Sequence, residues 1–430
     1  MNTYKKTLDY LYNKLPYYQR AGKVAYKANL NNSINLDNYF GNPHKRFKCI
    51  HIAGTNGKGS VSHMIASILQ TAGYKVGLYT SPHLKDFRER IKINGKEIPK
   101  EEVICFVKDN INIFNKIKPS FFEITVIMAF YYFAKERVDF AVIEVGLGGR
   151  LDSTNIITPE ISIITNISLD HTDLLGNSKE LIAKEKAGII KENIPVIKGQ
   201  SDTEIDYVFK EMAYLKNTKL YFADKIYSIN YSMLSTDNKQ ILNLKKNNKK
   251  AYSVLKLDLQ GYYQKFNVLP VLLAIDILNE KGLKINDSFV YKGLENTIKN
   301  TGIRGRWEVI GSNPLIVCDT AHNEEGIKQV VNQLNNTPYK KLHMVIGFVN
   351  DKKLNKILKL LPEDAIYYFT RAHIPRAMNE IKLQDLAAKY SLFGESFTDV
   401  KKAYTLAKSN ANTNDLIFIG GSTFVVAEVI

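Results

Sequence analysis

A glycine-rich segment near the start of the chain carries residue types that bind phosphate. Its sequence is Gly54-Thr55-Asn56-Gly57-Lys58-Gly59-Ser60, between a predicted strand and a predicted helix. Glycines let backbone N–H groups approach phosphate oxygens, and a helix N-terminus favours negative charge. Lys58 is expected to reach terminal phosphates and Ser60 to bind Mg²⁺. The spacing is shorter than in G-x-x-x-x-G-K-[ST], so a plain glycine turn is the alternative.

Two further polar side chains follow predicted strands. Glu144 ends the strand expected over 139–145, and His171 follows the strand expected over 161–166. Carboxyl ends of parallel strands meet at one sheet edge, where doubly wound sheets bind ligands. We therefore expect Ser60, Glu144 and His171 to hold magnesium together. The plainer alternatives are a surface carboxylate and a loop histidine, since Mg²⁺ normally prefers oxygen ligands.

Alternating apolar strands and amphipathic helices must position these residues, which predicts an α/β fold with parallel sheets. The apolar residues between 61 and 72 recur at helical spacing, and Gly73 is placed to end that helix in a left-handed conformation. Segment 122–135 is apolar nearly all round and predicts a buried helix. Segment 205–260 predicts a small antiparallel excursion, with a hairpin tip or loop in the lysine run over 245–250.

The remaining elements are predicted from the same patterns. Strands are expected over 48–53, 75–80, 139–145, 161–166 and 194–198, then over 315–319, 342–348, 365–370 and 415–419. In the second half, helices are expected over 323–335, 351–361, 380–390 and 399–409. The glycines of segment 300–305 predict a hinge between two α/β domains, over 1–299 and 300–430, with the ligand in the cleft between them.

Composition excludes several classes of protein. The 430 residues are 45% hydrophobic and 24% charged, which is typical of a globular chain and not of a disordered or fibrous one. Neither a membrane-spanning run nor a signal-peptide-like start is present, and the three cysteines are far apart. We therefore expect a cytoplasmic protein without membrane association. The net charge of +16 favours anionic small molecules, and nucleic-acid binding is the less favoured alternative because the lysines are scattered.

Several motifs taken together resemble the folylpolyglutamate synthase/dihydrofolate synthase family of the Mur ligase superfamily. They are GTNGKGS from residue 54, TSPHL from 80, EVGLGGRLDSTN from 144, LDHTDLLG from 169 and IAKEKAGI from 182. The resemblance continues at Gly305-Arg306, at 319–323 and at 420–423, and so covers nearly the whole chain. It implies a P-loop-type parallel-sheet domain that binds ATP and folate over 1–299 and a Rossmann-like ligase domain over 300–430.

The resemblance also implies an activity. The expected enzyme is an ATP-dependent amide ligase that adds L-glutamate to dihydropteroate, to reduced folates or to both, through an acyl phosphate. A single-function folylpolyglutamate synthase and another Mur-type ligase remain alternatives. A monomer is the family's usual state. Against a cell-wall ligase, only 46 residues precede the first strand; against a P-loop ATPase or GTPase stand the lysine at 186 and the second α/β domain.

Site residues follow from the resemblance position by position. The implied ATP contacts are Gly54, Thr55, Asn56, Gly57, Lys58, Gly59, Ser60, Asn267, Arg306 and Asp319. The implied metal ligands are Ser60, Glu144, His171 and Lys186, with two Mg²⁺ sites and a lysine carbamylated by CO₂ at Lys186. Catalytic roles fall to Lys58, Lys186, His171 and His322. The implied pterin-side substrate contacts are Ser81, Pro82, His83, Phe121, Phe122, Glu123, Leu151, Asp152 and Ser153.

Phe121 and Phe122 also have a plainer interpretation as helix-core rings, and Lys186 has one as a salt-bridged helix residue. Five positions depart from the family's motifs. Tyr263 replaces a histidine, Val268 an alanine, Arg304 a proline and Thr320 a glycine, and Glu324 stands where a proline often follows. These departures leave the detailed contacts to the nucleotide open.

Overall fold

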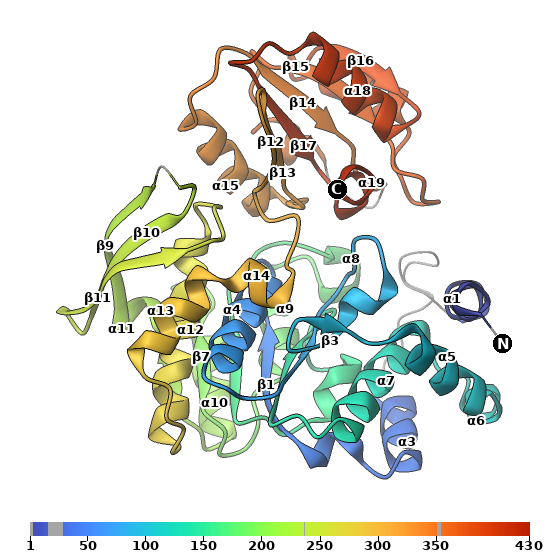
Figure 1. The fold of residues 1–430 in the computed structure, drawn as a ribbon, viewed down its shortest axis with the longest axis vertical. Coiled ribbons are helices and arrows are strands. Elements are labelled where there is room, and N and C mark those ends of the chain that lie inside the picture. Colours follow the sequence, from blue (N-terminus) through green and yellow to red (C-terminus); the bar gives the residue numbers. More distant parts are fainter. Residues whose placement is uncertain (1–2, 16–28, 236, 351–353) are drawn as a thin grey trace. The chain divides into compact units, whose positions relative to one another are not determined.

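The computed structural model describes residues 3–15, 29–235, 237–350 and 354–430 (Figure 1). The chain divides into two units. Unit 1 comprises Met1–Asp258 and Gln264–Gly302, and unit 2 comprises Leu259–Tyr263 and Ile303–Ile430. The short segment Leu259–Tyr263 therefore belongs to unit 2 although unit 1 precedes and follows it.

An eight-stranded sheet organises unit 1, in the order β4-β3-β2-β5-β1-β6-β7-β8. All neighbouring pairs are parallel except those of β3 with β2 and β4. The central strands are buried throughout their length, as parallel strands covered on both faces are. The strands are β1 (Lys48–Ala53), β2 (Val76–Tyr79), β3 (Ile91–Ile93), β4 (Lys96–Glu97), β5 (Phe140–Glu144), β6 (Ile161–Ile164), β7 (Val196–Lys198) and β8 (Leu220–Phe222).

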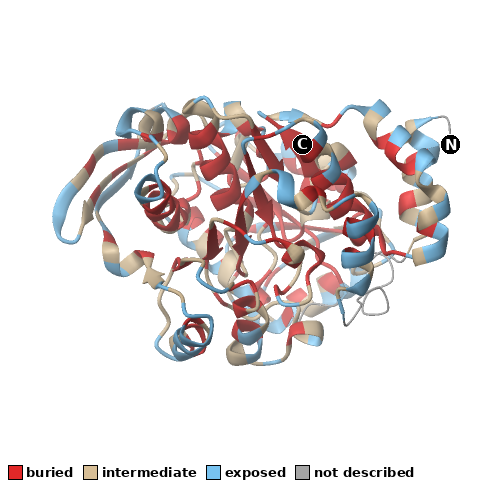
Figure 2. Cartoon of the chain, turned by 90° about the horizontal axis from the view of Figure 1, so that it is seen from below, coloured by how far each residue is buried: buried red, intermediate tan, exposed pale blue. Residues whose placement is uncertain are grey.

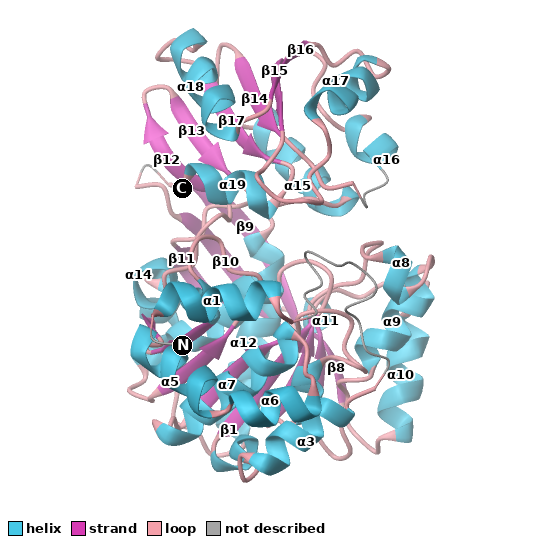
Figure 3. Cartoon of the chain, turned by 90° about the vertical axis from the view of Figure 1, so that its right-hand side faces the viewer, coloured by secondary structure: helices cyan, strands magenta, loops and turns pink. Residues whose placement is uncertain are grey.

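Helices lie on both faces of this sheet (Figure 3). The predicted buried helix is confirmed as α7, which Ser120 caps by accepting from the Glu123 amide. The helices are α1 (Tyr4–Asn13), α3 (Asn31–Tyr39), α4 (Lys58–Thr71), α5 (Lys100–Asp109), α6 (Ile111–Ile117), α7 (Phe121–Lys135), α8 (Thr172–Leu175), α9 (Lys179–Ala187), α10 (Asp206–Leu215), α11 (Ala223–Ile226), α12 (Gln264–Glu280), α13 (Asp287–Glu295) and α14 (Thr297–Thr301), with 3₁₀ turns η2 (Pro43–Arg46), η3 (Phe87–Arg90) and η4 (Ser153–Ile156).

Segment 205–260 is only partly the antiparallel excursion that its sequence predicts. The prediction is wrong for the first third of the segment, which forms α10 and then β8, a strand that pairs parallel to β7. The antiparallel sheet is confined to β9 (Tyr227–Leu234), β10 (Gln240–Lys246) and β11 (Lys249–Leu257). The lysine run does form a hairpin tip: Lys245 pairs with Lys250, and Asn247 and Asn248 have φ of 49° and 64°. Positive φ at both central residues is what a type I′ turn requires.

Unit 2 is built on a six-stranded sheet in the order β12-β13-β17-β14-β15-β16, parallel except for β12. Its strands are β12 (Glu308–Ser312), β13 (Leu315–Cys318), β14 (Leu342–Ile346), β15 (Ile366–Thr370), β16 (Gly394–Phe397) and β17 (Leu416–Gly420). Its helices are α15 (Glu324–Asn335), α16 (Leu354–Leu358), α17 (Glu380–Ala388), α18 (Val400–Asn410) and α19 (Thr423–Val429).

The nine strands predicted from apolar runs are all present in these two sheets. The helix predicted from the stripe of apolar residues after 60 is α4, and Gly73 follows it with φ of 94°. Of the helix predicted over 351–361, residues 351–353 lie outside the described residues, and 354–358 are helical. The buried residues gather in the strands and the inner helix faces, whereas the β9–β11 sheet carries many exposed ones (Figure 2).

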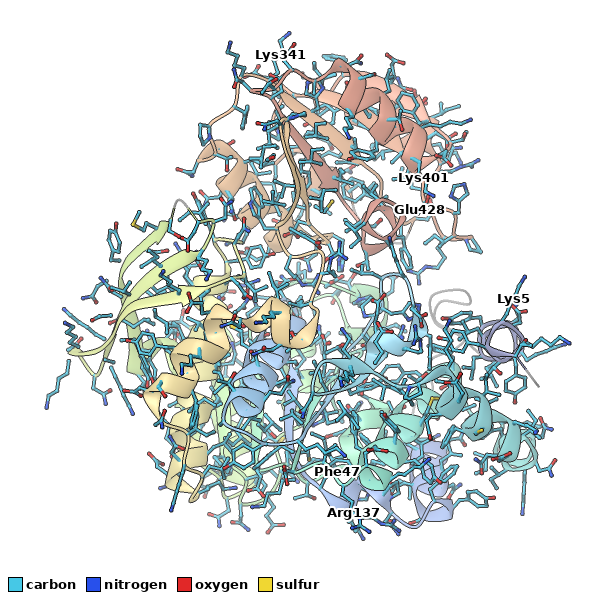
Figure 4. The ribbon with its side chains drawn as sticks, in the orientation of Figure 1. Lys5, Phe47, Arg137, Lys341, Lys401 and Glu428 are labelled. Atoms are coloured by element: carbon cyan, nitrogen blue, oxygen red, sulfur yellow. The ribbon has the colours of Figure 1, made fainter. Side chains whose placement is uncertain are left out.

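The basic side chains are dispersed, as the sequence predicts. Lys5, Arg137, Lys341 and Lys401 are each exposed and belong to different elements or loops (Figure 4). Among the described residues, none of the helices combines the length and the apolar character that a membrane crossing requires.

The hairpin tip gives a test of local backbone strain. Replacing Asn248 by alanine is expected to lower the free energy of unfolding by about 1 kcal/mol, because a Cβ without a compensating side-chain amide is unfavourable in the left-handed region. Replacing it by glycine should leave stability unchanged or raise it. Chemical denaturation of both variants measures the difference. Equal stability of the two would contradict the turn geometry.

Candidate active site

Residues 54–60, which run from the end of β1 into the first turn of α4, form a glycine-rich loop that we call the phosphate-type loop. At two of its glycines, any other residue would force neighbouring atoms to move. Gly54 has φ of 146°, and an added Cβ would lie 1.8 Å from Thr165 Oγ1. Gly57 has φ of 83°, and an added Cβ would lie 2.2 Å from Asn267 Oδ1. Because these contacts hold the loop against β6 and α12, the first turn of α4 begins at a fixed place. Its N–H groups have no acceptor within the helix and are a favourable environment for an anion.

The segment that follows β6 braces the same loop through hydrogen bonds. Thr55 and Asn56 donate their backbone N–H groups to the main-chain oxygen and to the side chain of Asn166, each at 2.9 Å. Thr165 donates its hydroxyl to the Asn56 carbonyl at 2.6 Å, and the hydroxyl of Thr55 donates to the Ser168 carbonyl at 3.1 Å. The loop conformation is therefore set by its neighbours within unit 1.

Two lysine side chains converge on one carbonyl of this loop. The Nζ atoms of Lys58 and Lys186 donate to the Gly54 oxygen at 3.0 and 2.8 Å. Burial, together with the charge of Lys58, lowers the pKa of Lys186 to about 7, although Asp170 and Asp152 favour its charged form. A large fraction of Lys186 is therefore a neutral, nucleophilic amine near pH 7.

Close backbone packing fixes the position of Lys186 on α9. The glycine-rich loop after β5 lies against this helix, and the Arg150 amide donates to the Glu185 carbonyl at 2.7 Å. An added Cβ at Gly149 would lie 2.8 Å from the same carbonyl, and one at Gly188 would lie 2.4 Å from the Arg150 Cβ. The loop and the helix can approach this closely only because both positions lack a side chain.

The three expected magnesium ligands of unit 1 follow three neighbouring strands, β5, β1 and β6. Glu144 is buried at the end of β5 and accepts from the Ser81 amide at 3.0 Å. Ser60 is buried in the first turn of α4, where its hydroxyl accepts from Gln264 Nε2 at 3.1 Å. His171 has φ of 48° and precedes α8. The hydroxyl, carboxylate and imidazole thus come from one edge of the sheet.

Around the expected substrate segment after β2, the imidazole of His83 has a defined protonation state. Arg90 donates its Nε–H to His83 Nδ1 at 2.7 Å, so Nε2 carries the proton and lies 3.4 Å from the Tyr12 hydroxyl. Burial, and then the charge of Arg90, hold the pKa of His83 well below its usual value. Ser81 and Pro82 precede this network, and Pro82 is exposed.

The three residues expected from the start of α7 have different environments. Phe121 is 1% exposed and belongs to the hydrophobic core. The ring of Phe122 lies against Gly146, where an added Cβ would be 2.3 Å from the ring. Glu123 accepts from the Ser120 amide at 2.5 Å as part of a capping box. Helix packing and capping account for Phe121 and Glu123; their substrate contacts stay predictions.

The carboxylate of Asp152 organises the loop after β5. It accepts from the Thr154 amide and hydroxyl at 3.0 and 2.5 Å and from another loop amide at 2.9 Å. Since Thr154 donates to Asp152, its oxygen accepts from the His51 Nε2 at 2.9 Å. Burial raises the pKa of Asp152. Ser153 is buried beside it, and Leu151 is partly exposed.

In unit 2, a second polar cluster surrounds the end of β13. The buried carboxylate of Asp319 accepts from the Tyr263 hydroxyl at 2.6 Å. Arg306 donates to the Thr320 hydroxyl, and His322 Nδ1 lies 3.0 Å from the Thr320 carbonyl. The three expected residues Arg306, Asp319 and His322 therefore share one short stretch of unit 2, whereas Asn267 lies in unit 1 beside the phosphate-type loop.

Several residues in these clusters were not predicted from the sequence. Asn166, Thr165 and Gln264 hold the loop and Ser60, and Arg90 orients His83. Asn166 is the last residue of a predicted strand, and a polar side chain at that place is a signal that could have identified it. Thr165 and Gln264 act through contacts with residues distant in sequence, and no motif indicates the contact of Arg90 with His83.

Comparison with known proteins places the chain in a family. The model described as "Mur ligase middle domain" matches residues 52–275, and "Mur ligase, glutamate ligase domain" matches residues 305–423. A "Dihydrofolate synthase/folylpolyglutamate synthase" of Bacillus subtilis is 32% identical over 419 residues, covering 95% of both chains. The Haloferax volcanii relative "Probable bifunctional folylpolyglutamate synthase/dihydropteroate synthase" is 31% identical over 91% of this chain, which spans only 47% of that protein.

Solved structures agree. "E.coli FolC in complex with DHPP and ADP" has a TM-score of 0.85 at 27% identity and covers 100% of this chain and 97% of that one. The bifunctional folylpolyglutamate synthase/dihydrofolate synthase of Yersinia pestis, complexed with AMPPNP and Mn ion, has a TM-score of 0.84 at 27% identity over 100% and 97% of the two chains. The fold is thus that of a Mur ligase. The chain belongs to the folylpolyglutamate synthase/dihydrofolate synthase family.

The loop geometry leads to a prediction about Gly54. Replacement by alanine should lower the free energy of unfolding by about 3 kcal/mol, because both the positive φ and the overlap with Thr165 oppose a Cβ. Chemical denaturation measures this loss. Gly73→Ala is the matched control: its φ is 94° but open space surrounds it, so its loss should be about 1 kcal/mol. An equal loss in both variants would contradict the close approach to Thr165.

Proposed function

We propose that this chain catalyses the ATP-dependent ligation of L-glutamate to dihydropteroate, to reduced folates or to both. The observation that carries the proposal is the phosphate-type loop with Lys58 and Lys186 on the Gly54 carbonyl, in a chain whose whole length has the family's sequence and fold. The names of the relatives, and the solved complexes with DHPP, ADP and AMPPNP, support the choice of substrates.

Activation of the acceptor carboxylate is the first chemical requirement, because a carboxylate is a poor electrophile. One carboxylate oxygen attacks the γ-phosphorus of ATP, the bond to the β-phosphate oxygen breaks, and ADP leaves. The amine of glutamate then attacks the acyl carbon, and inorganic phosphate leaves with the amide formed. Phosphoryl transfer depends mainly on positioning and charge neutralisation. Lys58 and the first turn of α4 supply both at the loop from Gly54 to Ser60.

The donor set after β5, β1 and β6 fits a divalent cation. Glu144 is buried at the carboxyl end of a central strand and offers carboxylate oxygens, the ligand type that Mg²⁺ prefers. We propose that Ser60, Glu144 and His171 hold Mg²⁺, which supplies charge neutralisation at the phosphates when bound. A second ion is proposed near Lys186. The Mn ion complexed with the Yersinia pestis enzyme supports a divalent metal in this family.

Carbamylation of Lys186 is proposed because this amine is buried, partly neutral near pH 7 and fixed beside the loop. The neutral nitrogen attacks the carbon of CO₂, an N–C bond forms and one amine proton is released to solvent. The product is an anion in place of a cation. That reversal of charge would suit a position beside a second metal ion.

The other site residues take proposed roles from their positions. Asn267, Arg306 and Asp319 are proposed to contact the nucleotide, and His322 the reacting groups. The segment 81–83, the residues Phe121, Phe122 and Glu123, and the segment 151–153 are proposed as the pterin-side contacts. A division of labour between domains over 1–299 and 300–430, action as a monomer and a cytoplasmic location remain proposals of the same kind.

The activity is tested by phosphate release from MgATP and L-glutamate with dihydropteroate or tetrahydrofolate as acceptor. Each product should gain one glutamyl residue by mass, because the amide forms at a single carboxylate. Lys58→Met should reduce kcat by at least about 100-fold, since it removes a charge from the phosphoryl-transfer site. Its control is Lys5→Met, an exposed lysine outside the site.

The pair of acceptors also separates the alternatives. Turnover with both supports the bifunctional enzyme, and turnover with one supports a single-function ligase. The absence of turnover with both, in a protein that binds ATP, would contradict the folate substrates and favour another Mur-type ligase.

Carbamylation is tested with ¹³C-bicarbonate. A carbamate carbon signal should appear by NMR and increase between about pH 6 and 8, because Lys186 loses its proton over this range and only the neutral amine reacts. Activity should fall in CO₂-depleted buffer and return on adding bicarbonate. The signal should vanish in Lys186→Arg and persist in Lys191→Arg, a half-buried lysine whose pKa burial lowers to about 8. A signal that follows Lys191 would reassign the modification.

A further inference from the structure

Four groups hold the carboxylate of Asp319. The Trp307 amide and the Tyr263 hydroxyl donate to Oδ2 at 2.8 and 2.6 Å, and the Ala321 amide donates to Oδ1 at 2.8 Å. The guanidinium of Arg306 adds its positive charge. Trp307 reaches the carboxylate from a left-handed backbone with φ of 50°, a conformation that costs energy for a bulky residue. The surroundings therefore fix the carboxylate in one orientation.

The neighbouring Thr320 performs the matching task for Arg306. Its hydroxyl accepts a hydrogen bond from the Arg306 Nη1 and donates to the Gly305 carbonyl at 3.2 Å. The backbone of Thr320 also donates to the Gly305 carbonyl at 3.1 Å. Arg306 would otherwise have four χ angles free to rotate. The contact with a buried hydroxyl restricts the direction in which its remaining N–H groups point.

We propose that Tyr263 and Thr320 are positioning residues of the nucleotide site: the Tyr263 hydroxyl holds Asp319, and the Thr320 hydroxyl holds Arg306, in the orientations that bind ATP. This inference rests on the proposed function, in which Asp319 and Arg306 contact the nucleotide. It assigns a task to two side chains through the residues that they hold.

Electrostatics give the Tyr263 contact a second consequence. Burial raises the pKa of Asp319, whereas the bond from Tyr263 and the charge of Arg306 lower it. The titratable and charged groups around this carboxylate are Tyr263 from the preceding linker, Arg306 from the segment before β12, and Cys318 on β13. Without the tyrosine hydroxyl, one of the interactions that lower the pKa of Asp319 is lost, while burial still raises it. The pKa of Asp319 should therefore rise further, and the ionised acceptor should be lost at a higher pH.

The position of Tyr263 in the chain adds to its importance. Tyr263 is the last residue of the segment that belongs to unit 2, and Gln264 is the first residue of α12 in unit 1. Gln264 donates to Ser60 in the phosphate-type loop, and Tyr263 donates to Asp319. Two consecutive side chains thus donate hydrogen bonds to two different residues that are proposed to bind the nucleotide, Asp319 and Ser60.

The test measures MgATP binding to the full-length chain by calorimetry as a function of pH. Tyr263→Phe should weaken binding about tenfold, since it removes a hydrogen bond to a charged group, and should move the acid limb of the affinity profile to higher pH. Tyr262→Phe is the matched control, because it leaves in place the hydrogen bond that the Tyr262 backbone N–H donates to Gln333 Oε1 at 2.6 Å. Thr320→Val should weaken binding without moving the acid limb, and Thr320→Ser should restore it.

The outcomes separate this inference from the proposed function. A wild-type chain that does not bind MgATP overturns both. A wild-type chain that binds MgATP, with Tyr263→Phe and Thr320→Val unchanged in affinity and pH profile, overturns this inference alone. Loss of binding in Tyr263→Phe with an unmoved acid limb and a melting temperature lowered in parallel assigns Tyr263 to folding only, which also overturns it.

Discussion

The convergence of two ammonium groups on the Gly54 carbonyl is the constraint on which the rest of the site depends. Like charges repel in a buried environment, and here the repulsion is relieved by keeping Lys186 partly neutral. The charge of Lys58 beside an amine whose pKa is lowered to about 7 supports the proposed binding of a polyanion and the proposed carbamylation. Both depend on the position of α9, because this helix places the Nζ atom of Lys186 beside the Gly54 carbonyl.

That helix position depends on close backbone contacts in addition to the packing of Ile182, Ala183 and Ala187 in the hydrophobic core. Gly149 and Gly188 allow the loop after β5 to touch α9, while Gly54 and Gly57 allow the phosphate-type loop to touch β6 and α12. Hydrogen bonds then fix what the glycines permit, as Asn166 does for two loop amides. These hydrogen bonds oppose movement of the loop away from its neighbours, and they can form only because the glycines permit the close approach.

Sequence patterns predicted the central strands well because their environment is uniform. A parallel strand covered on both faces is mostly apolar, and β1, β5 and β14 fit this rule because most of their residues are apolar and all but Lys48 are buried. Edge elements do not satisfy it: β16 reads Gly-Glu-Ser-Phe and is only partly buried, so it carries no apolar run. The prediction for helix α10 is wrong for a related reason. Polar residues dominate segment 205–260 as a whole and obscure the helix at its start.

For the site, predictability depends on how far apart in sequence the interacting residues lie. Glycines at 54 and 57 and a lysine at 58 are adjacent in sequence, so their chemistry can be predicted from spacing alone. The bond from Tyr263 to Asp319 joins residues 56 apart, and that from Gln264 to Ser60 joins residues 204 apart. Such pairs exist only after the sheets have formed, and a tyrosine or glutamine has many other ways to be satisfied. Local motifs therefore identify the groups proposed to act on the nucleotide, whereas the groups that orient them emerge only from the tertiary structure.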